Sequence, residues 1–160
     1  MGKIPAEIFF RYERVRAKYW RCYTGAELED MITKEPITPE RMHSLIRKDN
    51  IKILITFHEG KCDSYDGGGS ASFIGIRDGL PTYFIKITTG SYSKEEQKET
   101  LLHELIHVYY RTGNGLHDPH GEEVNKLIQK ETLRVLKQYP GFVNDLFESY
   151  KRNTEKSNHS

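Results

Sequence analysis

The chain has 160 residues, of which 24 are Lys or Arg and 23 are Asp or Glu, so its formal net charge is +1. This length suits a single domain with a hydrophobic core of its own. The near-neutral charge argues against a protein that binds nucleic acid over its whole surface. Because there are only two cysteines, Cys22 and Cys62, a disulfide scaffold and a four-cysteine zinc ribbon are both excluded.

The sequence also predicts in which cellular compartment the protein is found. Its apolar runs are only a few residues long, whereas a membrane-spanning helix needs roughly 20. No apolar segment of the kind found in secretory signals follows Lys3. We therefore expect a cytoplasmic protein with no membrane partner and with reduced thiols.

Helices are predicted in the N-terminal part, over residues 5–23, 26–33 and 39–47. In the first of these segments, apolar and basic side chains recur at helical spacing on two separate faces. Pro39 is suited to the first turn of the third segment. The apolar face consists of Ile8, Tyr12, Val15 and Tyr19, and the basic face of Arg11, Arg14, Lys18 and Arg21.

The middle of the chain is predicted to form strands. Residues 51–58 are rich in β-branched side chains, and residues 72–77 and 82–88 alternate between apolar and polar. Glycine-rich segments that favour turns separate them, including Asp78-Gly79. We expect a small meander of about three strands, in an antiparallel or mixed sheet.

Helices are predicted again in the C-terminal half. Ser93 and Glu96 form a capping-box pattern before a long helix that reaches Arg111. A second helix is expected over residues 121–138. The side chains expected to face inward from these two helices are Leu101, Leu105, Val108, Tyr109, Val124, Leu127, Ile128 and Leu133.

The end of the chain is predicted to hold a last short helix over residues 142–150. Residues 151–160 contain no aliphatic side chain and are expected to be a flexible tail. We see no boundary for a second domain, so residues 1–150 are predicted to form one.

The segment His103-Glu104-Leu105-Ile106-His107 carries the most specific chemical signal. On a helix, positions i and i+4 lie on the same face, so two imidazoles can reach one Zn²⁺. Glu104 is then placed to take a proton from the zinc-bound water, as in zinc peptidases. This pattern predicts a zinc cofactor held by His103 and His107, with Glu104 as the general base.

A catalytic zinc site needs a third protein ligand. The metzincin pattern is excluded, because Tyr110 and Gly113 stand where it requires a glycine and a histidine. Acidic and histidine side chains follow in the next loop and helix. The nearby candidates are His117, His120, Glu122, Glu123 and Glu131.

The HExxH segment, a gap of 12 residues and then His120-Gly121-Glu122-Glu123 resemble the SprT-like zinc peptidase domain over roughly residues 82–130. This family includes the Spartan proteases, which digest proteins crosslinked to DNA. The resemblance implies a zincin-like α+β fold, with His120 as the third zinc ligand. A fainter similarity of residues 122–125 to gluzincin-like families keeps Glu122 or Glu123 open as that ligand.

The basic face of residues 11–21 lies among aromatic side chains, and residues 1–23 carry a local excess of positive charge. Such a surface can bind phosphates while its aromatic rings stack on unpaired bases. Single-stranded DNA is therefore a partner to test, with Arg11, Arg14, Lys18 and Arg21 as the binding residues. In the SprT-like family, DNA binding also activates the protease.

The sequence supports two hypotheses about the function of the protein. The first is a zinc-dependent metalloendopeptidase that acts on proteins or peptides, including DNA-associated ones, with the extended substrate paired beside strand 82–88. The alternative is a zinc-stabilised module that binds nucleic acid or protein and whose protease activity is absent or latent.

Overall fold

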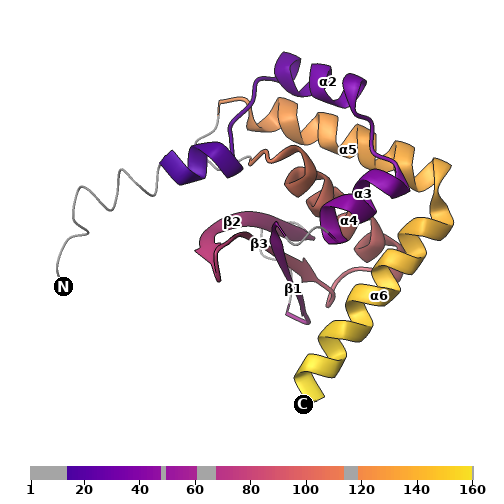
Figure 1. The fold of residues 1–160 in the computed structure, drawn as a ribbon. Coiled ribbons are helices and arrows are strands. Elements are labelled where there is room, and N and C mark those ends of the chain that lie inside the picture. The colour runs from indigo at the N-terminus through magenta and orange to yellow at the C-terminus, as the bar shows by residue number, and fades with distance from the viewer. Residues whose placement is uncertain (1–13, 48–49, 61–67, 114–118, 160) are drawn as a thin grey trace.

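The computed structural model describes residues 14–47, 50–60, 68–113 and 119–159, with side chains as far as residue 154. Within these ranges the chain has a mixed α+β fold, as the sequence predicts. A small sheet lies on one side, a central helix packs on it, and further helices cover that helix (Figure 1).

Helices α2 (Gly25–Lys34) and α3 (Pro39–Arg47) confirm two of the predicted N-terminal helices. α2 begins at a capping box formed by Thr24 and Glu27. The predicted helix 5–23 is described only from residue 14, and it ends at residue 19. It ends early because Trp20 is buried in the core and the backbone of Arg21 pairs with Thr112.

The sheet contains β1 (Lys52–His58), β2 (Gly69–Arg77) and β3 (Leu80–Thr88), in the order β1-β3-β2. β1 pairs with β3 in parallel, and β2 pairs with β3 antiparallel. The sheet is therefore mixed. The predicted meander is wrong, because the chain crosses from one edge of the sheet to the other between β1 and β2.

The turn between β2 and β3 agrees with the sequence. Asp78 and Gly79 have φ values of 54° and 78°, as in the two-residue type I′ turns that suit the twist of a hairpin. This turn places β3 in the centre of the sheet, paired on both sides. A substrate strand beside residues 82–88, as we expected, is therefore excluded, since neighbouring strands already occupy both backbone edges of β3.

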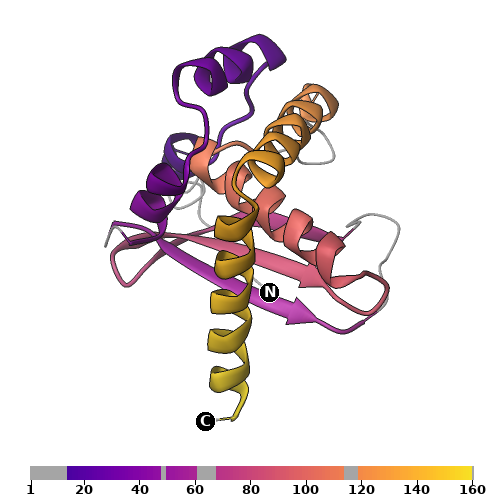
Figure 2. The same cartoon turned by 90° about the vertical axis from the view of Figure 1, so that its right-hand side faces the viewer.

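Helix α4 (Lys94–Tyr110) packs on β2 and β3, and α5 (Gly121–Gln138) packs on α4. α2 contacts the outer side of α5. The last helix, α6 (Pro140–His159), contacts α4, α5 and β1, and its end projects beyond the sheet (Figure 2).

The prediction for the end of the chain is wrong in one respect. The last helix begins at Pro140 and continues to His159, through the residues 151–159 that we expected to be a tail. A proline is tolerated in a first helical turn, and the side chains of Val143, Leu146 and Phe147 are buried along one stripe.

The core lies between the sheet and α4 and continues between α4 and the helices that cover it. Nearly all of the predicted inward positions are buried or half-buried, but Leu133 is 49% exposed. The α5 face that turns inward at this point carries Glu131, Thr132 and Val135 instead. The largest fully buried side chains include Tyr83, Ile85, Ile87, Leu101, Leu102, Leu105, Ile106, Ile128 and Phe147.

Among the helices that the structure describes, none is both long enough and apolar enough to cross a membrane.

Candidate metal centre

Helix α4 carries the HExxH segment through the middle of the molecule. Its start is fixed by the predicted capping box, in which the Ser93 hydroxyl accepts from the Glu96 N–H at 3.2 Å and the Glu96 carboxylate accepts from the Ser93 N–H at 3.0 Å. It ends at Arg111, whose backbone is in the left-handed region. Because α4 lies between the sheet and α5, side chains on several of its sides are buried.

His103, Glu104 and His107 form one cluster in which a ligand atom of each lies within 4.8 Å of the others. The two Nε2 atoms of the histidines are 3.2 Å apart. Two imidazoles at about 2.05 Å from one tetrahedral Zn²⁺ would have their nitrogens roughly 3.3 Å apart. The spacing of the two rings therefore fits a shared metal ion.

A backbone hydrogen bond sets the orientation of His107. Its Nδ1 lies 2.9 Å from the carbonyl oxygen of Thr112. A carbonyl only accepts, so Nδ1 carries the proton and Nε2 keeps its lone pair on the side of His103. Burial, with a contribution from His103, lowers the pKa of His107 to about 4. The ring is thus held neutral, which is the form that binds a metal.

Glu104 is buried at 7% exposure. Burial raises the pKa of its carboxyl to about 8, because a carboxylate loses solvation in this environment. A cation bound beside it would favour the charged form again. The acid is therefore placed to exchange a proton near neutral pH when a cation is present.

Helix α5 supplies two amides that sequence reasoning did not assign to the site. The Oε1 of Gln129 lies 2.8 Å from Nδ1 of His103, and the Oδ1 of Asn125 lies 2.9 Å from Nε2 of the same ring. Their i, i+4 spacing on a helix with an apolar face is the only sequence signal for them. Together these amides fix the plane of the His103 ring.

A cavity of about 220 Å³ lies beside the cluster. It is lined by the start of β2 at Gly69, by α4 and by α5. A Cβ atom at residue 69 would lie 2.7 Å from the Thr100 side chain, so glycine allows the strand to approach the helix. One edge of β2 is paired with β3, and its other edge is unpaired among the described strands.

None of the candidate third ligands that the structure describes belongs to this cluster. His120 precedes α5, and its Nδ1 is 3.8 Å from a Glu123 carboxylate oxygen. It is not part of the cluster of His103, Glu104 and His107. His117 lies outside the described residues.

The acidic alternatives have other contacts. Glu122 is paired with Lys126 at 3.4 Å, and Glu123 accepts from the Gly25 N–H at 3.3 Å. The buried Glu131 accepts from the Ile37 N–H at 2.7 Å. The contacts of Glu123 and Glu131 tie α5 to the segment around α2, and none of the three acids belongs to the cluster of His103, Glu104 and His107.

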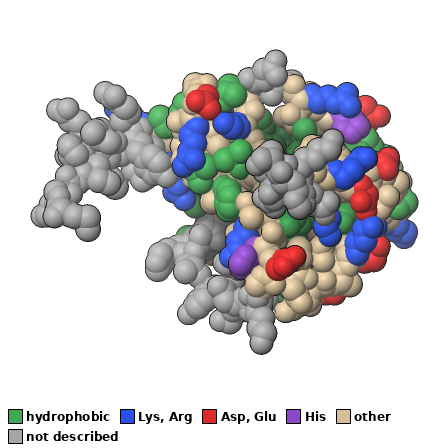
Figure 3. All heavy atoms as spheres, turned by 90° about the horizontal axis from the view of Figure 1, so that it is seen from below, with side chains coloured by type: hydrophobic (Ala, Val, Ile, Leu, Met, Phe, Trp, Pro, Cys, Tyr) green, Lys and Arg blue, Asp and Glu red, His purple; other side chains and the backbone are tan. Residues whose placement is uncertain are grey.

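The basic face is described in part. Arg14, Lys18 and Arg21 are exposed, and Arg11 lies outside the described ranges. On the face seen from below, basic side chains gather beside the N-terminal segment. Elsewhere on this face, basic and acidic side chains are intermixed (Figure 3).

The aromatic side chains of this segment are used within the protein. Trp20 is buried and lies 5.7 Å from the Tyr83 ring, and Tyr19 stacks on Phe73 at 5.9 Å. The ammonium of Lys18 lies 5.3 Å from the Tyr19 ring. The expected stacking surface for bases is therefore absent at Trp20, since its ring faces the core.

Comparison of the chain with protein-family models, with curated proteins and with solved structures found no match.

Proposed function

We propose that the protein is a zinc-dependent metalloendopeptidase of the SprT-like type. One observation carries the proposal. Two histidine Nε2 atoms lie 3.2 Å apart on one face of a helix, and the Glu104 carboxyl is buried in the same cluster. This spacing supports the proposal, because it matches that of two imidazole ligands on one tetrahedral ion, and a buried carboxyl beside them is suited to a general base.

His103 and His107 would hold the metal, with His120 as the proposed third ligand. Their imidazole nitrogens favour zinc among the common divalent ions. When bound, zinc supplies a Lewis acid and lowers the pKa of water. Glu104 takes the proton of the attacking water and transfers it to the leaving amine. The Gln129 amide would keep the His103 ring in position from its Nδ1 side, as hydrogen-bonded partners of metal ligands generally do, whereas Asn125 contacts Nε2, the nitrogen that would bind the metal.

The substrate is proposed to pair with β2 instead of β3. The start of β2 lines the cavity beside His103 and Glu104, and the outer edge of this strand is unpaired among the described strands. An extended peptide can add to such an edge through main-chain hydrogen bonds. Because these bonds do not involve the side chains of the peptide, they can position a peptide bond in many different sequences. This supports an endopeptidase with broad sequence tolerance.

The test combines metal content with cleavage. Wild-type protein is expected to contain one equivalent of zinc and to cleave casein. Glu104→Gln is expected to keep zinc and to lose cleavage, because only the proton acceptor is removed. The exposed Glu40 on α3 offers a matched control, Glu40→Gln, with unchanged cleavage. Cleavage by the Glu104→Gln variant would overturn the mechanism.

His120→Ala tests the third ligand in the same assay. We expect weaker zinc binding than in the wild type, and His58→Ala, at an exposed histidine at the end of β1, serves as the control. If His120→Ala binds zinc like the wild type, the third ligand is another residue.

A second function rests on the exposed basic side chains of the N-terminal segment. We propose that Arg14, Lys18 and Arg21 bind phosphates of single-stranded DNA, either as the main activity or as an activator of the protease. Binding should fall steeply with salt, and it should be lost in the triple alanine variant. Binding unaffected by these three changes would exclude this surface.

A further inference from the structure

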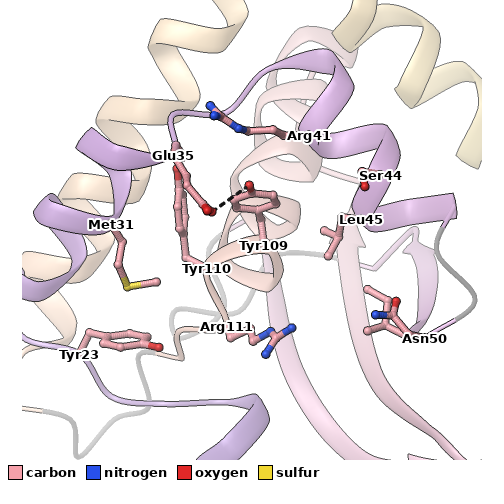
Figure 4. Close-up of a pocket in the computed structure, with 11 residues that line it drawn as sticks. Tyr23, Met31, Glu35, Arg41, Ser44, Leu45, Asn50, Tyr109, Tyr110 and Arg111 are labelled. Carbon is pink, nitrogen blue, oxygen red and sulfur yellow. Dashed lines mark hydrogen bonds between the residues drawn. The ribbon is translucent and has the colours of Figure 1, made fainter.

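A larger cavity, of about 410 Å³, lies away from the metal centre. It is formed where α2, α3 and the residues just before β1 meet the C-terminal end of α4 (Figure 4). It shares no lining residue with the cavity beside His103. Its volume is in the range of small-molecule binding sites.

Part of the wall is apolar and aromatic. The rings of Tyr23 and Tyr109 line the cavity from two sides, with Met31 and Leu45 between the helices (Figure 4). The Tyr109 ring is held in place by an edge contact to Tyr110, with centroids 4.9 Å apart. Such a surface suits a flat or hydrocarbon group.

Charged side chains line the cavity at both of its ends. At one end, Arg41 and Glu35 carry opposite charges, and the Glu35 carboxylate accepts from the Tyr109 hydroxyl at 3.3 Å. Arg41 also donates to the Pro36 carbonyl at 2.6 Å. At the other end Arg111 faces Asn50 across the opening (Figure 4). Among the described residues Arg111 forms no ion pair with a carboxylate, and its guanidinium lies 6.0 Å from the Tyr19 ring.

The backbone at Arg111 is a second observation. This residue ends α4 with φ 56° and ψ 43°. Glycine is the usual residue at this position of a helix end, because a Cβ atom is disfavoured in the left-handed conformation. An arginine at this place therefore points to a use for its side chain.

We propose that this cavity binds a small organic anion. Its carboxylate or phosphate group pairs with the Arg111 guanidinium, with the Asn50 amide beside it. Its flat or hydrocarbon part lies against the rings of Tyr109 and Tyr23. Guanidinium groups recognise both carboxylates and phosphates through paired N–H donors. The proposal does not depend on the metalloendopeptidase, because no metal ligand lines the cavity.

The experiment uses the full chain with its metal bound, and the Arg111→Gly variant separates binding in this cavity from binding at the metal centre. Calorimetric titrations with phenyl phosphate and with benzoate distinguish the two anions, and the tighter ligand identifies the group. Inorganic phosphate has no apolar group, so its affinity shows how much the aromatic wall contributes to binding. Benzylamine carries a positive charge on a similar ring, so it shows whether the cavity selects anions. We expect an aromatic anion to bind better than inorganic phosphate, and benzylamine not to bind.

Arg111→Gly is the decisive variant. It removes the guanidinium and places the favoured residue at a left-handed position, so the fold should be retained or stabilised. We expect binding to weaken by about tenfold or more, as for a lost hydrogen bond to a charged group. Arg47→Gln, at an exposed arginine on α3 outside the cavity, is the control.

The proposal is overturned if neither aromatic anion binds at millimolar concentration, or if Arg111→Gly binds as well as the wild type. Equal affinity for inorganic phosphate and phenyl phosphate would overturn the role of the aromatic wall. Failure of zinc binding or of casein cleavage would leave these results unaffected, so the two proposals fail separately.

Discussion

The Nδ1–H of His107 donates to the carbonyl oxygen of Thr112 at 2.9 Å. Thr112 belongs to a backbone bridge with the N-terminal segment, in which Arg21 donates to the Arg111 carbonyl at 2.8 Å and accepts from Gly113 at 3.2 Å. A histidine of the candidate metal centre is therefore oriented by a turn that a distant part of the chain holds. The geometry of the cluster depends on this connection as well as on the helix.

Gly113→Ala is predicted to disturb the connection. A Cβ atom at residue 113 would overlap the indole nitrogen of Trp20. Overpacking of this kind costs about 1–3 kcal/mol, and we expect a lower unfolding temperature together with weaker zinc binding. Gly141→Ala is the matched control, because a Cβ there would meet nothing within 4 Å. Equal stability of the two variants would contradict the overlap.

Zinc is predicted to stabilise the folded protein. A ligand that binds the native state raises the free energy of unfolding in proportion to the logarithm of its concentration above Kd. Differential scanning fluorimetry should show a higher melting temperature with zinc and a lower one after chelation. His103→Ala should lose this response, whereas His43→Ala, at an exposed histidine on α3, should keep it. A zinc response retained by His103→Ala would place the metal elsewhere.

Glu131 is predicted to be a structural residue. It is 4% exposed and accepts hydrogen bonds from the Ile37 N–H and from Arg134, at 2.7 and 2.8 Å on the same oxygen. Glu131→Ala leaves the buried Ile37 N–H without its acceptor, which costs about 1–3 kcal/mol, while the partly exposed Arg134 can turn to solvent, so the variant should unfold at lower denaturant concentration.

The exposed pair of Asp30 and Lys34, at 2.9 Å, is the control for this variant. Asp30→Asn should change the free energy of unfolding by about 0.5 kcal/mol or less. If Glu131→Ala failed to bind zinc but remained as stable as the wild type, Glu131 would be a metal ligand and not a structural residue.

Tyr83 is predicted to make stability fall at alkaline pH. Its hydroxyl donates to the Tyr19 carbonyl at 2.7 Å, and burial raises the pKa of Tyr83 from 10.0 to about 12. A folded-state pKa above the unfolded value favours the protonated, folded protein. The stabilisation is therefore complete below about pH 10 and is lost as pH rises towards 12.

The alkaline decrease in the free energy of unfolding amounts to about 2–3 kcal/mol. Denaturant titrations between neutral and strongly alkaline pH should show it. Tyr83→Phe should be less stable at neutral pH and should show a smaller alkaline decline, although Tyr150, whose pKa burial also raises to about 12, retains part of it. An unchanged alkaline slope in Tyr83→Phe would exclude Tyr83 as the source.

Local elements were predicted well because their signals are local. The capping box at Ser93 and Glu96 and the helix Gly121–Gln138 depend on side chains within a few residues of each other. The parallel pairing of β1 with β3 was missed, because it joins segments with another strand between them in the sequence. The exposure of Leu133 was missed for a related reason: which α5 positions turn inward depends on how that helix packs on its neighbours.

The pairing of His103 with His107 could be predicted from the chain, because positions i and i+4 share a face wherever the helix lies. The contacts of Asn125 and Gln129 with His103 could not, since these amides lie on a separate helix. Nor could the place of Arg111 beside a second cavity, because α2, α3, the segment before β1 and the end of α4 meet there only through packing. Backbone spacing fixes neighbours along one helix, but the burial of apolar faces selects which helices and strands meet.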